Sequence, residues 1–325
     1  MSVIGSTATE RVVASSDFRV VDVDGIPTRY HVDGAGQPLV LLHGGYFGFP
    51  DSLDTWSRNF ASLAERFRVY ALDRVGQGFT GNPRADGDYT EDFVLRHAAR
   101  WLEDLGISDA HLVGHSRGGL LAARLALARP GFARSLVFIS SASLAPDPEE
   151  PALQMSAFYA KLGIDDHLGP WTREQMRAEP EANSFSHAHI TDGYLDRYLE
   201  ISRRPEFEEV RRKMREGLAA EVYLPSLRRV RADTLRAIDE RGLPCRCLCA
   251  WGVNDPSAPL KEAGMPLFER ICRKTQSAEF RIFNQAGHYV YREHPREFNE
   301  LLSTFCSSDA RQRSPGLGRR QADGF

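Results

Sequence analysis

Two patterns of apolar and polar positions alternate along most of the chain. Short apolar runs predict strands at residues 38–45, 67–73, 111–114, 135–141, 245–252 and 278–284. The runs at 38–45 and 67–73 lack polar alternation, which indicates strands that are covered on both faces. Between these runs, apolar residues at helical spacing predict helices at 92–106, 119–129, 260–272 and 295–306. Strands and helices that alternate in this way are typical of a mostly parallel sheet with crossover helices on both faces. The pattern therefore predicts an α/β fold.

The pattern differs at the start of the chain and in its middle. "FRVVDVDG" and "IPTRYHVDG" predict a hairpin that turns at Asp24-Gly25, and residues 55–65 predict a further helix. From 145 to 238 no buried strand is expected, only polar helical patterns such as "PEFEEVRRKMREGLAAEVY". This segment is much longer than a usual crossover, so we interpret it as a helical cap. The expected domains are a core of residues 1–144 and 239–306, a cap of 145–238, and a disordered tail of 307–325.

Composition narrows the classes of function. The chain has 325 residues, 42% of them hydrophobic, and a net charge of -3, which argues against nucleic-acid binding. The N-terminus does not have the pattern of a signal peptide, and no stretch is apolar enough to span a membrane. We therefore expect a cytoplasmic protein that binds a small molecule, with neither nucleic acid nor membrane as partner. Whether the chain forms a homo-oligomer is left open.

The cysteines and histidines do not predict a metal site. Cys245, Cys247 and Cys249 alternate along one predicted strand and share a face, and no second cluster supplies further ligands. His187 and His189 lack a third ligand nearby and are expected in the cap near the pocket. We expect reduced core cysteines, no metal and no cofactor.

A G-x-S-x-G sequence at residues 114–118 lies between a predicted strand and a predicted helix. That context is typical of a nucleophile elbow, in which a sharp turn exposes a strained serine, here Ser116, beside a helix N-terminus. The other interpretation of these five residues is a plain glycine-rich turn. Asp255 in "WGVNDP" and His288 in "FNQAGHYVY" each follow a predicted strand. All three would share the carboxyl edge of the sheet, in the order Ser, Asp, His, which predicts a catalytic triad.

An oxyanion hole requires two hydrogen-bond donors beside the serine. "HGG" directly follows a predicted strand, so the candidates are the backbone N–H groups of Gly45 and of Arg117, the residue after the serine. Gly44 would line the substrate site. By contrast, the G-x-G-x-x-G at residues 76–81 is followed by turn formers rather than by a helix, so we do not interpret it as a nucleotide site.

With these residues the chain resembles α/β-hydrolase-fold enzymes, with matching motifs from about Leu39 to Phe305. It most resembles the meta-cleavage product hydrolases, which break a carbon–carbon bond in ring-opened aromatic compounds. The similar segments are "HGG" followed by a Pro/Gly-containing loop and Trp56, then "WGVNDP", "AGHYVYREHPREFN" and, in the cap, "ITDGYLDRYLEISRRPEF". The resemblance implies an α/β-hydrolase core, a helical cap and a serine nucleophile.

The resemblance also implies substrate-binding residues. Arg197, followed by Tyr198, would bind the carboxylate of a dienoate substrate, and Tyr289 stands where the family commonly has Trp. His115 stands where many members have Asn, and Arg117 where the residue is often apolar. These departures bear on the substrate more than on the fold. A carboxylesterase, a lactonase, a natural-product-tailoring enzyme and a ligand receptor on the same fold therefore stay open as alternatives.

Overall fold

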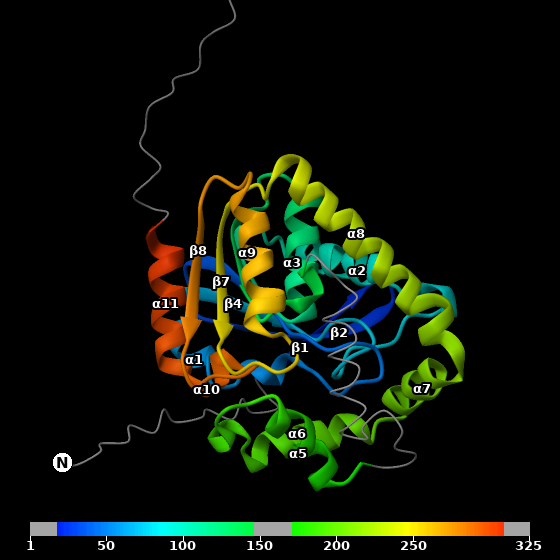
Figure 1. Ribbon diagram of the computed structural model, residues 1–325. Helices are drawn as coiled ribbons and strands as arrows, with labels where there is room; N and C mark the ends of the chain where they lie inside the picture. The colour runs from blue at the N-terminus through cyan, green and yellow to red at the C-terminus, as the bar shows by residue number, and fades with distance from the viewer. Residues whose placement is uncertain (1–17, 146–170, 309–325) are drawn as a thin grey trace, which may run out of the picture.

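The structure is a computed structural model that describes residues 18–145 and 171–308 (Figure 1). Its centre is an eight-stranded sheet in the order β1-β2-β4-β3-β5-β6-β7-β8. The first three strands of this order pair antiparallel, and the remaining pairs are parallel. The strands are β1 (Phe18–Val23), β2 (Ile26–Asp33), β3 (Gln37–Leu42), β4 (Phe67–Leu72), β5 (Ala110–His115), β6 (Ala133–Ile139), β7 (Arg246–Gly252) and β8 (Ala278–Phe283). The alternating pattern predicted this mostly parallel α/β arrangement, and the resemblance implied its α/β-hydrolase form.

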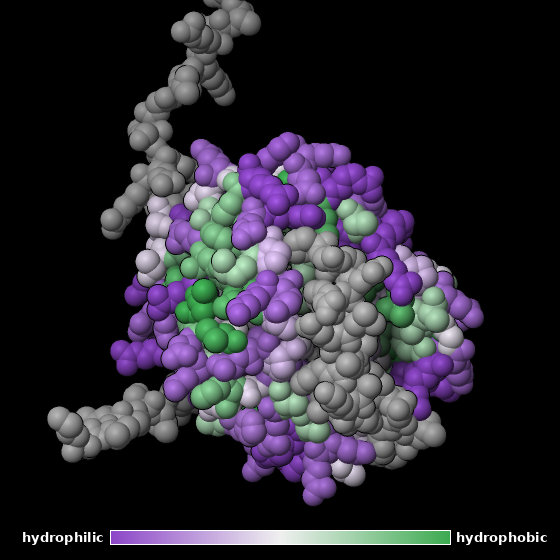
Figure 2. All heavy atoms as spheres, in the orientation of Figure 1, coloured by the Kyte–Doolittle hydropathy of each residue, from purple (hydrophilic) through white to green (hydrophobic). Residues whose placement is uncertain are grey.

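Helices cover both faces of the sheet, and each face has its own apolar core. One core includes buried residues of the helices α2 (Glu91–Asp104), α3 (Arg117–Ala128), α8 (Leu224–Arg241) and α9 (Met265–Cys272). The other includes buried residues of α1 (Phe60–Ala64), α10 (Val290–Glu293) and α11 (Pro295–Ser308). Cys247 and Cys249 lie in the first core. Among the residues that Figure 2 colours by hydropathy, most of those on the visible surface are hydrophilic, as expected for amphipathic helices that turn their apolar sides to the sheet.

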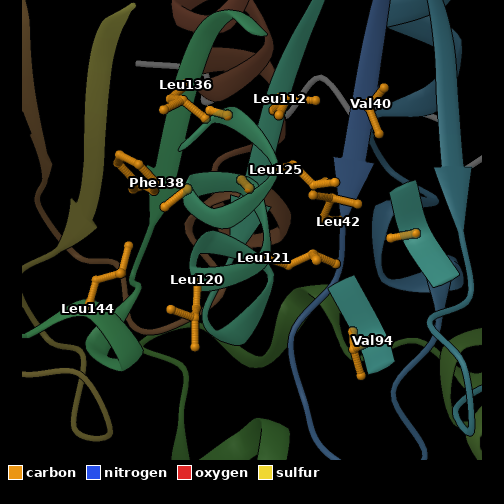
Figure 3. Packing of buried hydrophobic residues seen from close by; sticks show 14 of the residues in the cluster. Val40, Leu42, Val94, Leu112, Leu120, Leu121, Leu125, Leu136, Phe138 and Leu144 are labelled. Carbon is orange, nitrogen blue, oxygen red and sulfur yellow. The ribbon is translucent and has the colours of Figure 1, made fainter. Parts of the chain in front are cut away.

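The packing of α3 fixes the position of the predicted elbow. Leu121 and Leu125 of α3 lie against Val40, Leu42 and Leu112 of the central strands (Figure 3), and all five residues are fully or almost fully buried. Burial of one leucine side chain stabilises a fold by about 1.5–3 kcal/mol. Several such contacts hold α3 at the end of β5.

The middle of the chain is helical where the structure describes it. The helices are α5 (Arg173–Ala182), α6 (Asp192–Ser202), α7 (Pro205–Lys213) and α8. A π-helical segment, Met214–Tyr223, precedes α8, and a short 3-10 turn, His187–His189, follows α5. Figure 1 shows α5 and α6 beyond the carboxyl ends of β7 and β8. Residues 146–170 of the expected cap lie outside the described residues.

The expected division into core and cap stays a prediction. Helix α8, most of which falls within the expected cap, packs against α2, α3 and α9 of the core. Helix α11 continues to Ser308, and the rest of the expected tail lies outside the described residues. Within the described residues, no helix is both long and apolar enough to cross a membrane.

The hairpin at the start is confirmed, with Asp24 and Gly25 at φ values of 50° and 79° in the turn. The single helix expected at residues 55–65 is wrong, because a short 3-10 turn at Leu53–Trp56 and the helix α1 replace it. Asp54 in that turn pairs with the buried Arg29, and the N–H of Leu53 donates to Asp73. These tertiary bonds fix the turn where the sequence pattern alone favours a continuous helix.

Candidate active site

Ser116 lies at the sharp turn between β5 and α3. Its backbone has φ 51° and ψ −119°, a strained conformation for a residue other than glycine. A Cβ atom on Gly114 would lie 2.3 Å from the carbonyl oxygen of Gly118, and one on Gly118 would lie 2.1 Å from that of Leu42. The turn therefore admits only glycine at these two positions.

Backbone hydrogen bonds hold this strained turn in place. The N–H of Ser116 donates to the carbonyl oxygen of Ile139 (2.8 Å) at the end of β6. Its own carbonyl oxygen accepts from the hydroxyl groups of Ser141 (2.6 Å) and Ser143 (3.1 Å). Such surrounding bonds are required for a strained backbone to persist.

His288 and Asp255 form a buried hydrogen-bonded pair in the loops after β8 and β7. The Nδ1 atom of His288 lies 2.8 Å from Oδ2 of Asp255. The other oxygen of Asp255 accepts from the N–H groups of Ser257 (3.0 Å) and Ala258 (2.8 Å). Because a carboxylate only accepts, His288 carries a proton on Nδ1, which leaves Nε2 able to accept one.

Charges around His288 favour its protonated form. Burial lowers the pKa of His288, but the charge and hydrogen bond of Asp255 and the nearby carboxyl groups of Glu179 and Asp51 outweigh it, so that the pKa is raised. The cation that forms when a base takes a proton from a nucleophile is thus stabilised at this position.

His115, the residue before Ser116, supports the loop that carries His288. Its Nε2 atom lies 3.1 Å from the carbonyl oxygen of His288, and its Nδ1 lies 3.3 Å from the hydroxyl of Tyr291. Because a carbonyl oxygen only accepts, Nε2 carries the proton and Nδ1 accepts from Tyr291. Burial lowers the pKa of His115 well below its ordinary value, so the ring is neutral. The unusual histidine of this elbow therefore positions the loop of the second histidine.

The Gly44–Gly45 loop lies against Ser116. A Cβ atom on Gly44 would be 2.9 Å from the Cβ of Ser116, and Gly45 has φ 75°. The carbonyl oxygen of Gly44 accepts from Nδ1 of His43 (2.9 Å) and from the guanidinium group of Arg74 (3.2 Å). In a trans peptide the N–H points away from the carbonyl oxygen, so the N–H of Gly45 faces the side opposite Arg74.

Arg117 begins helix α3, and its side chain points toward aromatic rings. The guanidinium group donates to the hydroxyl of Tyr223 and lies 5.1 Å from the ring centre of Tyr46, next to Gly45. Tyr223 in turn donates to Glu91 (2.9 Å). The structure thus places a guanidinium group over the residue that follows the Gly44–Gly45 loop.

Arg197 lies in a different set of contacts. Its Nε is 3.5 Å from Oδ1 of Asp54, its Nη1 is 2.5 Å from Glu200, and its guanidinium group lies over the rings of Phe18 and Phe79. Within the described residues, none of these partners forms a hydrogen bond, ion pair or ring contact with Ser116 or His288. The described contacts of Arg197 therefore do not connect it to the predicted triad.

Tyr198 and Tyr289 lie among buried acidic groups. The hydroxyl of Tyr289 donates to both carboxylate oxygens of Glu179, at 2.8 and 3.0 Å. The hydroxyl of Tyr198 donates to Oδ1 of Asp51 (3.3 Å). The carboxyl groups of Asp51 and Glu179 are close enough that each raises the pKa of His288. No pattern in the sequence indicates either acid.

The cap is hydrogen-bonded to the loop of His288. The N–H of His288 donates to the carbonyl oxygen of Asn183 (2.7 Å), just after α5. The carboxylate of Glu293 accepts from the N–H groups of Gly287, Phe185 and Ser186 at 2.8–2.9 Å. The bonds from His288 to Asn183 and from Phe185 and Ser186 to Glu293 join residues more than 100 positions apart, and no local sequence signal indicates them.

Within the described residues, no group of three His, Cys, Asp or Glu side chains is arranged to hold a metal ion. Residues 76–81 form turns rather than the start of a helix. His189 is buried, bonded to Ser184 (2.8 Å) and Arg292 (3.2 Å).

A strained serine between a parallel strand and a helix, with a buried His–Asp pair at the same edge of the sheet, is typical of α/β hydrolases. The sequence pattern of the alpha/beta hydrolase family matches residues 39–301. The chain belongs to this family.

Several characterised proteins are similar over almost their whole length. A 2-hydroxymuconate semialdehyde hydrolase from Pseudomonas sp. (strain CF600) is 31% identical, with 89% of this chain and 93% of that protein aligned. One from Pseudomonas putida is 30% identical, over 87% of this chain and 92% of that protein. A solved meta-cleavage product hydrolase from Pseudomonas fluorescens superposes with a TM-score of 0.71 at 26% identity, and covers 89% of this chain and 97% of that one.

Proposed function

We propose that the protein is a serine-dependent hydrolase that cleaves a carbon–carbon bond in a dienoate that also carries a ketone or aldehyde group. The observation that carries the proposal is the buried His288–Asp255 pair at the edge where Ser116 is held in a strained turn. The relatives at 31% and 30% identity are named as hydrolases of such compounds, which supports this kind of reaction.

In the proposed mechanism, His288 is the base and later the acid. Nε2 of His288 accepts the proton of the Ser116 hydroxyl or of a water molecule, and the nucleophile oxygen bonds to the substrate's keto carbon. The N–H groups of Gly45 and Arg117 would bind the oxyanion that forms. Because the dienol of the substrate ketonises before the attack, the carbon–carbon bond breaks with its electron pair passing into a stabilised dienolate, and His288 returns the proton to this leaving group. If Ser116 was the nucleophile, water hydrolyses the resulting acyl-enzyme.

The second candidate function is carboxylester hydrolysis, which needs no proton transfer to carbon and no cation for a substrate carboxylate. The contacts of Arg197 with Asp54 and Glu200 favour this candidate, because they occupy the guanidinium group expected to bind the dienoate. Tyr198 and Tyr289 would line the substrate site in either case.

Replacement of Arg197 separates the two candidates. If Arg197 binds a dienoate carboxylate, Arg197→Ala abolishes dienoate cleavage and largely preserves hydrolysis of a short aryl ester. Steady-state rates on both substrates, measured with wild type and variant, test this. Equal loss on both substrates contradicts the binding role and indicates a structural role beside Asp54.

A further inference from the structure

Asp51 differs from the other buried acids near the site in its partners. Asp73 pairs with the guanidinium group of Arg29 at 3.0 Å, which also pairs with Asp54. Asp255 accepts three hydrogen bonds besides the one from His288. Asp51 is only 6% exposed, and the described residues give it one hydrogen bond, from Tyr198 at 3.3 Å, and no ion pair. A buried carboxylate without a directly paired cation is unfavourable, so this group is expected to keep its proton.

The charged groups that face Asp51 come from four parts of the structure. Burial and the carboxylate of Glu179 in α5 raise its pKa, while Tyr198 in α6, Arg74 after β4 and His288 lower it. The net effect raises the pKa of Asp51 to about 7. The carboxyl group is therefore largely neutral below neutral pH.

Asp51 lies beside the loop that would bind the oxyanion. A Cβ atom on Gly45 would be only 2.0 Å from Oδ2 of Asp51, and one on Gly44 would be 2.9 Å from the Cβ of Ser116. Ser116 and Asp51 thus both lie against the Gly44–Gly45 loop. An ionised carboxylate here would repel a developing oxyanion, whereas a neutral carboxyl group is able to donate to it.

The hydrogen bonds of the cap select which oxygen of Asp51 carries the proton. The hydroxyl of Tyr194 donates to that of Tyr198 (2.6 Å), which donates to Oδ1 of Asp51. Because Oδ1 accepts, it is the carbonyl-like oxygen of the neutral carboxyl group, and the proton resides on Oδ2. This is the oxygen that faces Gly45.

We propose that Asp51 works as a protonated carboxyl group, whose Oδ2–H donates a hydrogen bond to the substrate oxygen at the Gly44–Gly45 loop. The proposal rests on the active site proposed above and holds for either bond type, because ester and ketone cleavage both form an oxyanion. It gives the cap a role besides holding the loop of His288, since Tyr194, Tyr198 and Glu179 of the cap would set the protonation state of Asp51.

The test is the pH dependence of kcat for a short aryl ester, in wild type and three variants. In wild type the rate falls as Asp51 ionises, by about 30-fold at pH 8.5 for a pKa of about 7. In Asp51→Asn this fall disappears, because the amide donates at every pH. In Glu179→Gln the fall moves to lower pH, and in Tyr198→Phe it moves to higher pH, since the two neighbours act on Asp51 in opposite directions.

Asp192→Asn is the matched control, because this carboxyl group is on α6 and 85% exposed, and its profile should equal that of wild type. A fall at the same pH in Asp51→Asn as in wild type overturns the Asp51 proposal and leaves the proposed function intact. Unshifted profiles in Glu179→Gln and Tyr198→Phe overturn it too, and they decide the matter if Asp51→Asn fails to fold. If wild type hydrolyses neither ester nor dienoate, the proposed function is wrong, and the substrate contact of Asp51 is wrong with it.

Discussion

Replacement of Asp51 by asparagine should stabilise the protein increasingly as the pH rises. The pKa of Asp51 is raised from 3.8 to about 7 in the folded state, mainly by burial and by Glu179. Below pH 3.8 the group is protonated in both states and costs nothing. Between these values only the unfolded chain ionises, so the free energy of unfolding of wild type falls with pH, and above pH 7 the full cost is present.

The magnitude follows from the size of the shift. A change of about 3 pKa units corresponds to about 4 kcal/mol, of which about 2.5 kcal/mol develops between pH 5 and pH 8. Asparagine has nearly the same shape and does not ionise, so the variant escapes this cost. The stability of Asp51→Asn relative to wild type should therefore rise by that amount over this range.

Urea unfolding at pH 5, 6, 7 and 8, followed by tryptophan fluorescence, measures the difference. Asp192→Asn, which removes an exposed carboxyl group on α6, should differ from wild type in stability by the same amount at every pH. A stability difference between Asp51→Asn and wild type that stays constant from pH 5 to pH 8 would refute the reasoning, because it would mean that Asp51 ionises in the folded protein as it does in the unfolded chain.

Other substitutions test the supports of the site. Gly118→Ala should destabilise the protein by about 3 kcal/mol or prevent folding, because the new Cβ would lie 2.1 Å from the carbonyl oxygen of Leu42. Chemical denaturation measures the loss of stability, and a loss below about 0.5 kcal/mol would contradict the prediction. His115→Phe keeps a buried ring but removes the bond to the carbonyl oxygen of His288, so kcat should fall on the order of 10-fold with little change in KM. An unchanged kcat would show that the loop holds its position without His115.

The general fold could be predicted, and the candidate triad remains a prediction of the same kind, because each depends on local patterns. Apolar runs predict strands, glycines around Ser116 predict a tight turn, and residues after parallel strands meet at one edge of the sheet. The acids of the site could not be predicted in this way. Asp51 follows a proline in a loop, Glu179 precedes Pro180 in a polar helix, and their contacts cross from core to cap.

The same reason applies to Arg197. The sequence around Arg197 predicts a helix and resembles the meta-cleavage product hydrolases. The partners of the long arginine side chain, however, depend on which acids the fold brings nearby. Asp54 lies in the 3-10 turn Leu53–Trp56, just before the helix predicted at residues 55–65 and replaced by this turn and α1.

One absorbance experiment decides the proposed reaction. Purified wild type and Ser116→Ala are each mixed with a yellow ring-fission dienoate and, separately, with a short aryl ester. We expect wild type to bleach the dienoate at a rate at least about 10³-fold above that of Ser116→Ala. Ester hydrolysis without bleaching would contradict carbon–carbon cleavage and support the esterase candidate, and equal rates for both proteins would contradict a nucleophilic role for Ser116.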